Sequence, residues 1–407
     1  MIDRAKSVIA QCRRIGGFTE EPGRITRRFL SPPVHEVHAY LRKRMEALGM
    51  TTHVDAAGNL RGLWQPPGAL GKRLILGSHI DTVPNAGAYD GVLGVVLALE
   101  LVFEAHLLEL PLAVEVIAFS EEEGVRFGIP FLGSLAAAGR FDAALLELKD
   151  ADGISLEKAI RDFGLDPVQM AAATVDADAF GFLEIHIEQG PVLETENLSL
   201  AVVEGIVGQT RLEFRFSGRA NHAGTTPMIL RRDALAAAAE WVTEVEALAR
   251  ATDGLVATVG KFDVEPDAAN VIPGLVSASL DLRHMKDSIR ARCTTELAGK
   301  AGAIAARRGI ELDCVPMMDQ PSVHMNDELT ARLLSAVEAA GYAGRKMPSG
   351  AGHDAMVMAM RVPTAMLFLR SPGGISHHPA ETVLDEDVEA ALLAGQKFLE
   401  QLAAEFG

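Results

Sequence analysis

The segment from Leu74 to Gly94 constrains the fold more than any other part of the chain. It begins with an apolar run that has the length and composition of a buried strand. His79 and Asp81 follow this run, and a loop rich in proline, asparagine and glycine then leads to Asp90. From Val92 to about Leu110, an apolar pattern predicts a long buried helix. This order of strand, loop and helix predicts an open α/β sheet, in which ligands bind outside the carboxyl ends of the strands.

The polar residues of this segment support two interpretations. In the first, His79 and Asp90 face one cleft and bind a divalent transition metal, while Asp81 accepts the second N–H of the imidazole. In the second, Asp81 and Asp90 are turn and helix-capping residues, and His79 is a surface histidine. This segment alone favours neither interpretation over the other.

Histidines and acids recur where other predicted strands end. The further strands are 113–119 before Glu121-Glu122-Glu123, 182–187 with His186 inside it and Glu188-Gln189-Gly190 after it, and 364–369 before Arg370 and the pair His377-His378. Taken singly, a charge run is usually a solvated face and a histidine on an apolar strand is usually a core residue. Because the same residue types occupy the same position after several strands, we favour the functional interpretation.

The composition limits the classes of protein and partner. A chain of 407 residues is long enough for two domains or more, each with its own core. The 38 basic and 55 acidic residues give a net charge of −17, which argues against nucleic acid or an anionic membrane as a partner. Three scattered cysteines and an N-terminus without a signal-peptide core predict a cytoplasmic protein.

A change of pattern at Gln209 predicts an inserted domain. The segment 209–322 has the element order β-α-β-β-α-β, which is the split unit of a ferredoxin-like sandwich. The predicted elements are 210–216, 232–250, 255–262, 276–282, 287–308 and 310–316. Because the α/β pattern is similar on both sides of this insertion, residues 1–208 and 323–407 are expected to form one discontinuous catalytic domain.

The predicted strand ends supply three histidines and several carboxylates, the groups that a two-metal hydrolytic site requires. One acid must stay off the metals to deprotonate the attacking water, and the glutamate run has enough members for both roles. A serine hydrolase that uses Ser349 or Ser376 is an alternative from a different class. Neither serine lies in a nucleophile-elbow pattern, so the metal interpretation is favoured.

Several motifs together resemble the M20 metallopeptidase superfamily. They are His79-x-Asp81, Asp90-Gly91, Glu122-Glu123-Gly124, His186-Ile187-Glu188-Gln189-Gly190, Asn221-His222-Ala223-Gly224 and His377-x-Pro379. They occur in order along nearly the whole chain. The string from His186 to Gly190 resembles the hydantoinase/carbamoylase branch, which includes allantoate amidohydrolases, N-carbamoyl-L-amino-acid hydrolases and β-ureidopropionases.

The resemblance implies an α/β/α catalytic domain with a mixed sheet and two divalent metal ions. The implied ligands are His79, Asp90 and His186 for one ion, and Asp90, Glu123 and His377 for the other. Asp90 would bridge the two ions. Zinc or manganese is expected, and cobalt or nickel is also compatible with imidazole and carboxylate ligands.

The same resemblance assigns the remaining residues of the site. Glu122 would be the general base, because Glu122 and Glu123 immediately precede Gly124 as in the family pair. His377 is preferred to His378 because the family spacing is His-x-Pro. Asp81 would support the ligands.

The inserted domain is implied to be a lid that also forms a homodimer. The residues implied for substrate binding are Gln189, His222, Asn270, Arg283 and His353, some of them across the dimer. His222 would also act in catalysis by polarising the scissile carbonyl. The planar guanidinium of Arg283 suits a substrate carboxylate.

The predicted function is that of a cytoplasmic, dimeric, binuclear-metal amidohydrolase that cleaves a carbamoyl C–N bond and releases ammonia and carbon dioxide. Allantoate is the favoured small-molecule ureido substrate, because Arg370 offers a cation for a polar substrate. The alternatives are an N-carbamoyl-L-amino-acid hydrolase and, more distantly, an M20 aminoacylase or peptidase. A non-catalytic metal-binding relative is a further alternative, although such a protein needs no base at Glu122.

Overall fold

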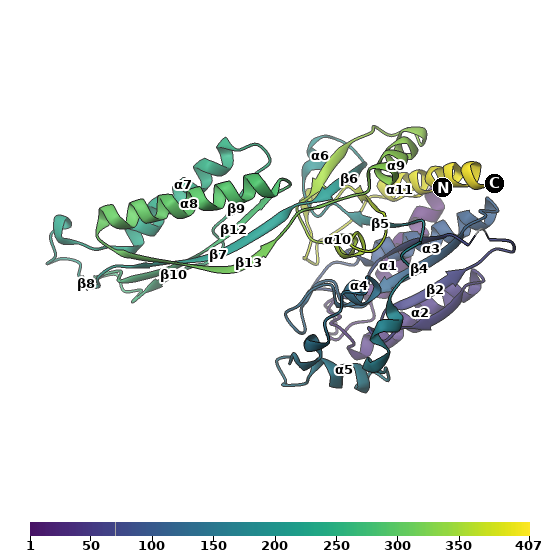
Figure 1. The fold of residues 1–407 in the computed structure, drawn as a ribbon, viewed down its shortest axis with the longest axis horizontal. Coiled ribbons are helices and arrows are strands. Elements are labelled where there is room, and N and C mark those ends of the chain that lie inside the picture. Colours follow the sequence, from purple (N-terminus) through teal and green to yellow (C-terminus); the bar gives the residue numbers. More distant parts are fainter. Residues whose placement is uncertain (70) are drawn as a thin grey trace. The chain divides into compact units, whose positions relative to one another are not determined.

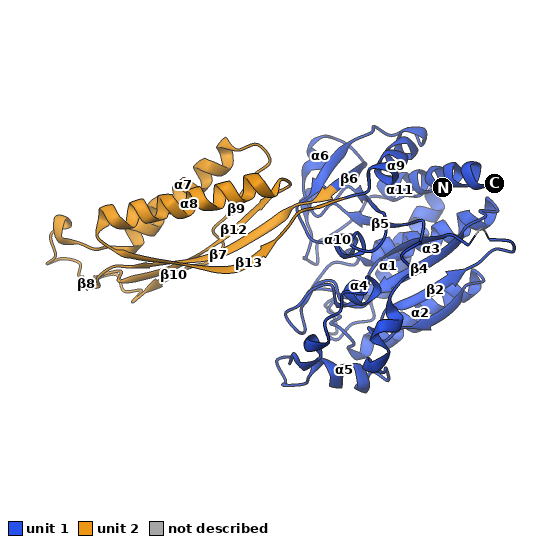
Figure 2. Ribbon diagram, viewed as in Figure 1, with its two compact units in different colours: residues 1–204, 325–407 blue, residues 205–324 orange. Residues whose placement is uncertain are grey.

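The computed structural model describes residues 1–69 and 71–407, and these residues divide into two compact units. Unit 1 contains Met1–Glu204 and Met325–Gly407, and unit 2 contains Gly205–His324 (Figure 2). In the described part of the chain, none of the helices is both long and apolar enough to cross a bilayer.

A mixed sheet forms the centre of unit 1 (Figure 1), and it has nine strands when the short β14, whose residues fall in unit 2, is counted. Its strands are β1 (Thr51–Val54), β2 (Leu60–Trp64), β3 (Arg73–His79), β4 (Ala113–Phe119), β5 (Gly181–Ile187), β6 (Leu200–Ile206), β14 (Val323–His324), β15 (Lys346–Ser349) and β16 (Thr364–Leu369). Their order is β1-β2-β4-β3-β5-β16-β6-β14, and β15 pairs with β6. The predicted α/β class with a mixed sheet is therefore confirmed.

The four strands in the middle of this sheet are parallel to one another. β3 pairs in parallel with β4 and β5, and β16 pairs in parallel with β5. The pairs of β1 with β2, β2 with β4, and β16 with β6 are antiparallel. The carboxyl ends of β4, β3, β5 and β16 consequently meet at one edge of the sheet, where ligands bind in such folds.

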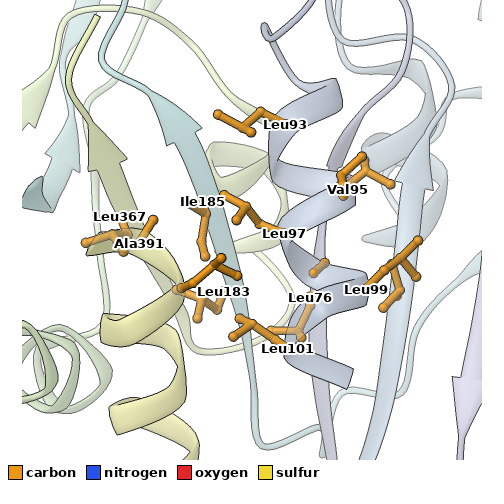
Figure 3. Close-up of a cluster of buried hydrophobic side chains, with 14 of the residues drawn as sticks. Leu76, Leu93, Val95, Leu97, Leu99, Leu101, Leu183, Ile185, Leu367 and Ala391 are labelled. Atoms are coloured by element: carbon orange, nitrogen blue, oxygen red, sulfur yellow. The ribbon is translucent and has the colours of Figure 1, made fainter. Parts of the chain in front are cut away.

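Helices cover both faces of the sheet. They are α1 (Ile2–Gly16), α2 (Pro32–Ala47), α3 (Val92–Leu107), α4 (Leu132–Ala137), α5 (Leu156–Asp162), α6 (Val192–Thr195), α9 (Asp327–Ala339), α10 (Asp354–Met358) and α11 (Asp385–Phe406), with 3-10 helices at η1 (Ala143–Glu147), η2 (Pro167–Ala173) and η4 (Pro372–Gly374). Figure 3 shows Leu97 of α3 in one buried cluster with Ile185 of β5. On the other face, Ala355 N of α10 donates to Glu184 Oε2 at 2.8 Å, since Glu184 alternates with Ile185 along β5.

Unit 2 has a five-stranded antiparallel sheet and two long helices. Its elements are β7 (Gly208–Ser217), β8 (Asn221–His222), η3 (Met228–Leu230), α7 (Ala234–Ala251), β9 (Val256–Thr258), β10 (Phe262–Glu265), β11 (Val271–Ile272), β12 (Leu275–His284), α8 (Asp287–Arg308) and β13 (Glu311–Gln320). The sheet order is β10-β12-β7-β13, and β9 pairs with β12. Trp241 of α7 and Leu297 of α8 pack with Phe214 of β7 in the core of this unit. The predicted segment 209–322 lies inside unit 2.

The single strand predicted at 255–262 is wrong, because the structure has two strands there. In β9, Thr258 pairs with Asp281, and in β10, Phe262 pairs with Ala278. Between these two pairs, the chain from β9 to β10 therefore contains one more residue than β12 does, as in a β-bulge. Alternating sequence patterns do not reveal such an extra residue. The prediction also missed the strands β6, β14 and β15.

Replacing Gly94 by alanine tests the close contact between α3 and the sheet. A Cβ atom there would overlap the carbonyl oxygen of Ile185 and lie 2.8 Å from Ser78 Cβ. We expect Gly94→Ala to lower the free energy of unfolding by about 1–3 kcal/mol, measured by urea denaturation. Gly302→Ala in α8 is the matched control, because a Cβ at Gly302 has no atom within 4 Å, and it should stabilise the protein by about 0.5–1 kcal/mol. A stabilising Gly94→Ala would contradict this packing.

Candidate metal centre

The parallel strands bring the predicted ligands together in unit 1. His79 is the last residue of β3, His186 lies near the end of β5, and Asp90 lies just before α3. The glutamates at 121–123 follow β4, and His377 lies in the segment after β16. Each residue therefore reaches the site because a parallel strand ends or a helix begins beside it.

Asp90 and two histidines form the first group of candidate ligands. Asp90 Oδ1 lies 3.2 Å from His79 Nε2 and 3.1 Å from His186 Nε2, and all three side chains are buried. Nδ1 of His79 faces the carbonyl of Asp81 at 3.1 Å, and Nδ1 of His186 faces the carbonyl of Ile187 at 2.9 Å. Because a carbonyl can only accept, each Nδ1 carries a proton, and each Nε2 faces the space next to Asp90.

Glu123 and His377 form a second group with Asp90. His377 Nε2 lies 3.4 Å from Asp90 Oδ2 and 3.5 Å from Glu123 Oε1. His377 has a φ of 55°, which is uncommon for a residue other than glycine and often marks a functional site. Nδ1 of the neighbouring His378 instead accepts the backbone N–H of Ala380 at 3.1 Å. Of the two histidines, His377 is thus the one that approaches the acids.

Negative charge is concentrated at this site. Glu122 lies close to His79 and Glu123 in a third group. Burial raises the pKa of Glu122 well above its usual value, and burial with the charge of Asp90 raises the pKa of Glu123 to about 8. Burial alone would lower the pKa of His79, but hydrogen bonds to Asp81 and Asp90 raise it. Crowded buried carboxylates with facing imidazoles are a donor set that fits divalent metal ions, whose charge offsets the repulsion.

Asp81 connects the ends of two strands. Its Oδ1 and Oδ2 accept the backbone N–H groups of Glu122 and Glu123, both at 3.0 Å. Its Oδ1 also lies 3.4 Å from His79 Nδ1, although the carbonyl of Asp81 is closer to that ring. The sequence predicted a supporting role toward the histidine, but no local signal indicated the bonds to the glutamate segment.

Arg27 is a second buried charge beside the ligands, and the sequence analysis missed it. Its Nε donates to the carbonyl of Ile80, between His79 and Asp81, at 2.6 Å. Another nitrogen donates to the carbonyls of Ile15 and Phe18 at the end of α1. Burial lowers the pKa of Arg27 to about 10, and the charge of Asp81 opposes this shift. Arg27 lies in a polar segment that resembles a surface loop, so sequence patterns gave no signal for it.

Gln189 directs its amide toward the candidate ligands. Its Nε2 donates to Asp90 Oδ2 at 2.8 Å and lies 3.4 Å from His377 Nε2. Ser376 Oγ donates to the same oxygen of Asp90 at 2.8 Å. Two neutral donors therefore fix one oxygen of Asp90, while the two buried imidazoles face the other.

His353 is buried next to His186. The two ring centroids are 4.5 Å apart, and His353 Nε2 lies 3.0 Å from Ser349 Oγ. The serine hydroxyl donates to the carbonyl of Ala351 at 2.8 Å and is itself buried. Because this hydroxyl proton points to the Ala351 carbonyl, His353 Nε2 donates to the serine oxygen and cannot act as its base. Ser376 directs its hydroxyl to Asp90, so the geometry does not favour the serine-hydrolase alternative for either serine.

The other predicted substrate-binding residues lie in unit 2, in two separate places. His222 of β8 pairs with Val271 of β11, and the Asn270 carbonyl accepts the backbone N–H of Ala223 at 2.9 Å. Arg283 lies near the opposite end of β12, where its Nε donates to Asp281 Oδ1 at 2.8 Å. The strand between Leu275 and Arg283 spans about 27 Å at ~3.4 Å per residue. The structure therefore brings His222 and Asn270 together but separates both from Arg283.

Arg370 does not have the role that the sequence analysis gave it. Its guanidinium binds Asp387 of α11 through two hydrogen bonds of 2.8 and 2.9 Å, and Asp387 is fully buried. The pair joins the end of β16 to the start of α11. The prediction of a polar substrate from Arg370 is therefore wrong, because the guanidinium already binds the carboxylate of Asp387.

Histidines and carboxylates that parallel strands bring to one edge of a mixed α/β sheet are typical of the class of metal-dependent hydrolases. The chain belongs to Peptidase family M20/M25/M40, whose family model matches residues 75–405. The predicted M20 resemblance is thus confirmed.

Two relatives and one solved structure are similar over nearly the whole chain. An allantoate deiminase of Arabidopsis thaliana is 38% identical over 96% of this chain and 81% of its own length. An N-carbamoyl-L-amino acid amidohydrolase of Geobacillus stearothermophilus is 37% identical over 92% of both chains. The crystal structure of a hydantoinase/carbamoylase family amidase from Burkholderia multivorans matches with a TM-score of 0.92 and 31% identity over 98% of both chains. The branch predicted from the string at 186–190 is also confirmed.

Asp81→Asn tests whether this carboxylate organises the metal ligands. An asparagine keeps one acceptor oxygen but turns an NH₂ group toward one of the two backbone donors. We expect the affinity of metal-stripped protein for Zn²⁺ to fall about 10–100-fold, measured by isothermal titration calorimetry. Asp166→Asn is the control, because Asp166 also accepts a backbone N–H, from Val168 at 3.1 Å, but it is exposed and lies just before η2. Equal affinity in both variants would contradict the role of Asp81.

Proposed function

We propose that the protein is a binuclear-metal amidohydrolase that cleaves the carbamoyl C–N bond of a carboxylate-bearing ureido compound, with allantoate as the substrate. The observation that carries this proposal is the position of Asp90 between two groups of candidate ligands, beside an acid that belongs to neither. The balanced reaction consumes one water: R–NH–CO–NH₂ + H₂O gives R–NH₂, CO₂ and NH₃.

In this proposal, His79, Asp90 and His186 hold one ion, and Asp90, Glu123 and His377 hold the other. When bound, two divalent ions polarise a carbonyl and lower the pKa of water. Zinc or manganese fits these ligands, and cobalt or nickel is also compatible. Gln189 and Ser376 keep one oxygen of Asp90 oriented through their hydrogen bonds of 2.8 Å.

Glu122 acts as the general base in the proposed mechanism. It takes a proton from the water that adds to the ureido carbonyl carbon, and it returns a proton to the leaving nitrogen. The bond from Asp81 to the backbone N–H of Glu122 fixes the main chain of this residue. Burial raises the pKa of Glu122, and enzymes commonly raise the pKa of a carboxylate that serves as a general base toward the working pH.

The residues of unit 2 contribute to the site of a homodimer in this proposal. A ureido substrate is on the order of 10 Å long, whereas β12 alone spans about 27 Å from Leu275, which follows the β8–β11 pair, to Arg283. One substrate molecule can therefore contact all three only if they come from two chains. His222 and Asn270 would stabilise the developing oxyanion, and Arg283 would bind the substrate carboxylate. His353 and Gln189 would support the pocket from unit 1.

The choice of allantoate depends on the relatives. Relatives named allantoate deiminase and N-carbamoyl-L-amino acid amidohydrolase match this chain to a similar degree. An N-carbamoyl-L-amino-acid hydrolase is therefore the second candidate. We also propose a cytoplasmic location, in keeping with the unpaired Cys12, Cys293 and Cys314.

Ammonia release from the ureido compounds and acetate release from the N-acetyl compounds distinguish these candidates. Metal-stripped protein is assayed with allantoate, N-carbamoyl-L-amino acids and N-acetyl-L-amino acids, before and after Mn²⁺ or Zn²⁺ is restored. We expect release of ammonia from allantoate only after metal is restored. Turnover of the N-carbamoyl compounds instead would select the second candidate. Cleavage of the N-acetyl compounds alone would contradict the ureido proposal.

Glu122→Gln tests the general base. We expect kcat to fall about 10²–10⁴-fold, because the amide cannot accept the proton of water, while metal content measured by mass spectrometry is unchanged. Glu121→Gln is the neighbouring control, since Glu121 is buried outside the candidate ligand groups. A large loss in Glu121→Gln with activity kept in Glu122→Gln would shift the assignment by one residue.

A further inference from the structure

The buried carboxylate of Glu381 lies against the segment that carries Asp90. Its Oε1 accepts the backbone N–H of Tyr89 at 2.9 Å and that of Asp90 at 3.1 Å. Glu381 is only 5% exposed, and it belongs to the same turn as His377, since its own N–H donates to the carbonyl of His378 at 3.0 Å. One acid therefore connects the turn after β16 with the residues just before α3.

The segment before Asp90 is shaped to fit this carboxylate. A Cβ atom at Gly87 would overlap the side chain of Glu381, so only glycine allows this approach. Asn85 has a φ of 56°, which turns the chain in the left-handed region at the start of the same segment. The backbone at 87–90 thus packs closely against this carboxylate, and the N–H groups of Tyr89 and Asp90 share one of its oxygens.

The same turn also controls an oxygen of Asp90. Ser376 Oγ donates to Asp90 Oδ2 at 2.8 Å and lies 3.5 Å from Glu381 Oε2. The hydroxyl proton therefore belongs to the shorter bond, with Asp90. Glu381 binds the backbone N–H of Asp90, and Ser376 binds its side-chain oxygen. This turn therefore determines both the position and the rotation of the Asp90 carboxylate.

We propose that Glu381 is a positioning residue that holds Asp90 in the orientation required to bridge the two metal ions. This proposal rests on the proposed function only in taking Asp90 as the bridging ligand. Glu381 acts through the main chain of Asp90 and has no contact with substrate. Loss of its acceptor oxygen should therefore change metal binding and kcat, and leave KM nearly unchanged.

A cavity next to Glu381 makes a sharper test possible. This cavity has a volume of about 680 Å³, and its lining includes Gly87, Tyr89 and Glu381. Removing the Glu381 side chain would open a carboxylate-sized space that is continuous with this cavity. Formate or acetate from solution can then supply the missing acceptor to Tyr89 N and Asp90 N.

The experiment compares Glu381→Ala, Glu381→Gln and Gly87→Ala with the unmodified protein. Co²⁺ is bound to each metal-stripped protein, and the visible absorption spectrum, the affinity, kcat and KM are measured. We expect Glu381→Ala to lower Co²⁺ affinity at least about 10-fold and to alter the spectrum. Glu381→Gln should stay near the unmodified protein, because its amide oxygen still accepts both N–H groups. Gly87→Ala should show the same loss of Co²⁺ affinity as Glu381→Ala, because the new Cβ atom at position 87 displaces the Glu381 carboxylate.

Rescue separates positioning from a general loss of structure. Formate should restore the Co²⁺ spectrum and kcat of Glu381→Ala, whereas chloride at equal ionic strength should not. Gly87→Ala should not respond to formate, since its displaced carboxylate still fills the space. The unmodified protein with formate controls for direct binding of formate to the metal, and circular dichroism checks that each variant is folded.

An unchanged Co²⁺ spectrum and affinity in folded Glu381→Ala would overturn the proposal, and so would a spectral change that formate does not reverse. Failure of the unmodified protein to bind Co²⁺ would instead overturn the proposed function. The two failures are therefore distinguishable in one set of measurements.

Discussion

The candidate metal centre depends on the hydrogen bonds of Asp81. Two adjacent parallel strands, β3 and β4, end side by side, and the N–H groups of Glu122 and Glu123 beyond the end of β4 need partners outside the ladder. The Asp81 carboxylate, from the segment after β3, accepts both exposed N–H groups of the segment after β4. Hydrogen bonds to a charged group contribute about 1.5–3 kcal/mol each, and here they fix the main chain that carries Glu122 and Glu123. These bonds hold the candidate ligands at the edge of the sheet in fixed positions.

Buried charges support three of the ligand segments from the backbone side. Arg27 binds the carbonyl of Ile80, Asp81 binds two glutamate N–H groups, and Glu381 binds the N–H groups at the start of α3. Removing water from a charge is costly, so each charge needs several partners to remain buried. Backbone groups supply these partners, which leaves the side chains of His79, Glu122 and Asp90 free to face the ligand space.

Much of the fold and of the ligand set could be predicted from the sequence, because both depend on local patterns. Apolar runs predict β3, β4, β5 and β16, and the polar residues that follow them are read directly from the chain. Arg27 and Glu381 could not be predicted, because their partners lie far away in the sequence and their own segments are polar. Arg370 was misinterpreted for the same reason, since Asp387 reaches it only in the folded chain. The bulge between β9 and β10 also depends on pairing with β12.

The central claim is that Asp90 bridges two metal ions, and anomalous diffraction tests it most directly. Crystals of the zinc-loaded protein would be measured above and below the zinc absorption edge. The account predicts two anomalous peaks, one among His79, His186 and Asp90 and one among Glu123, His377 and Asp90. A single peak, or two peaks that do not share Asp90, would contradict it.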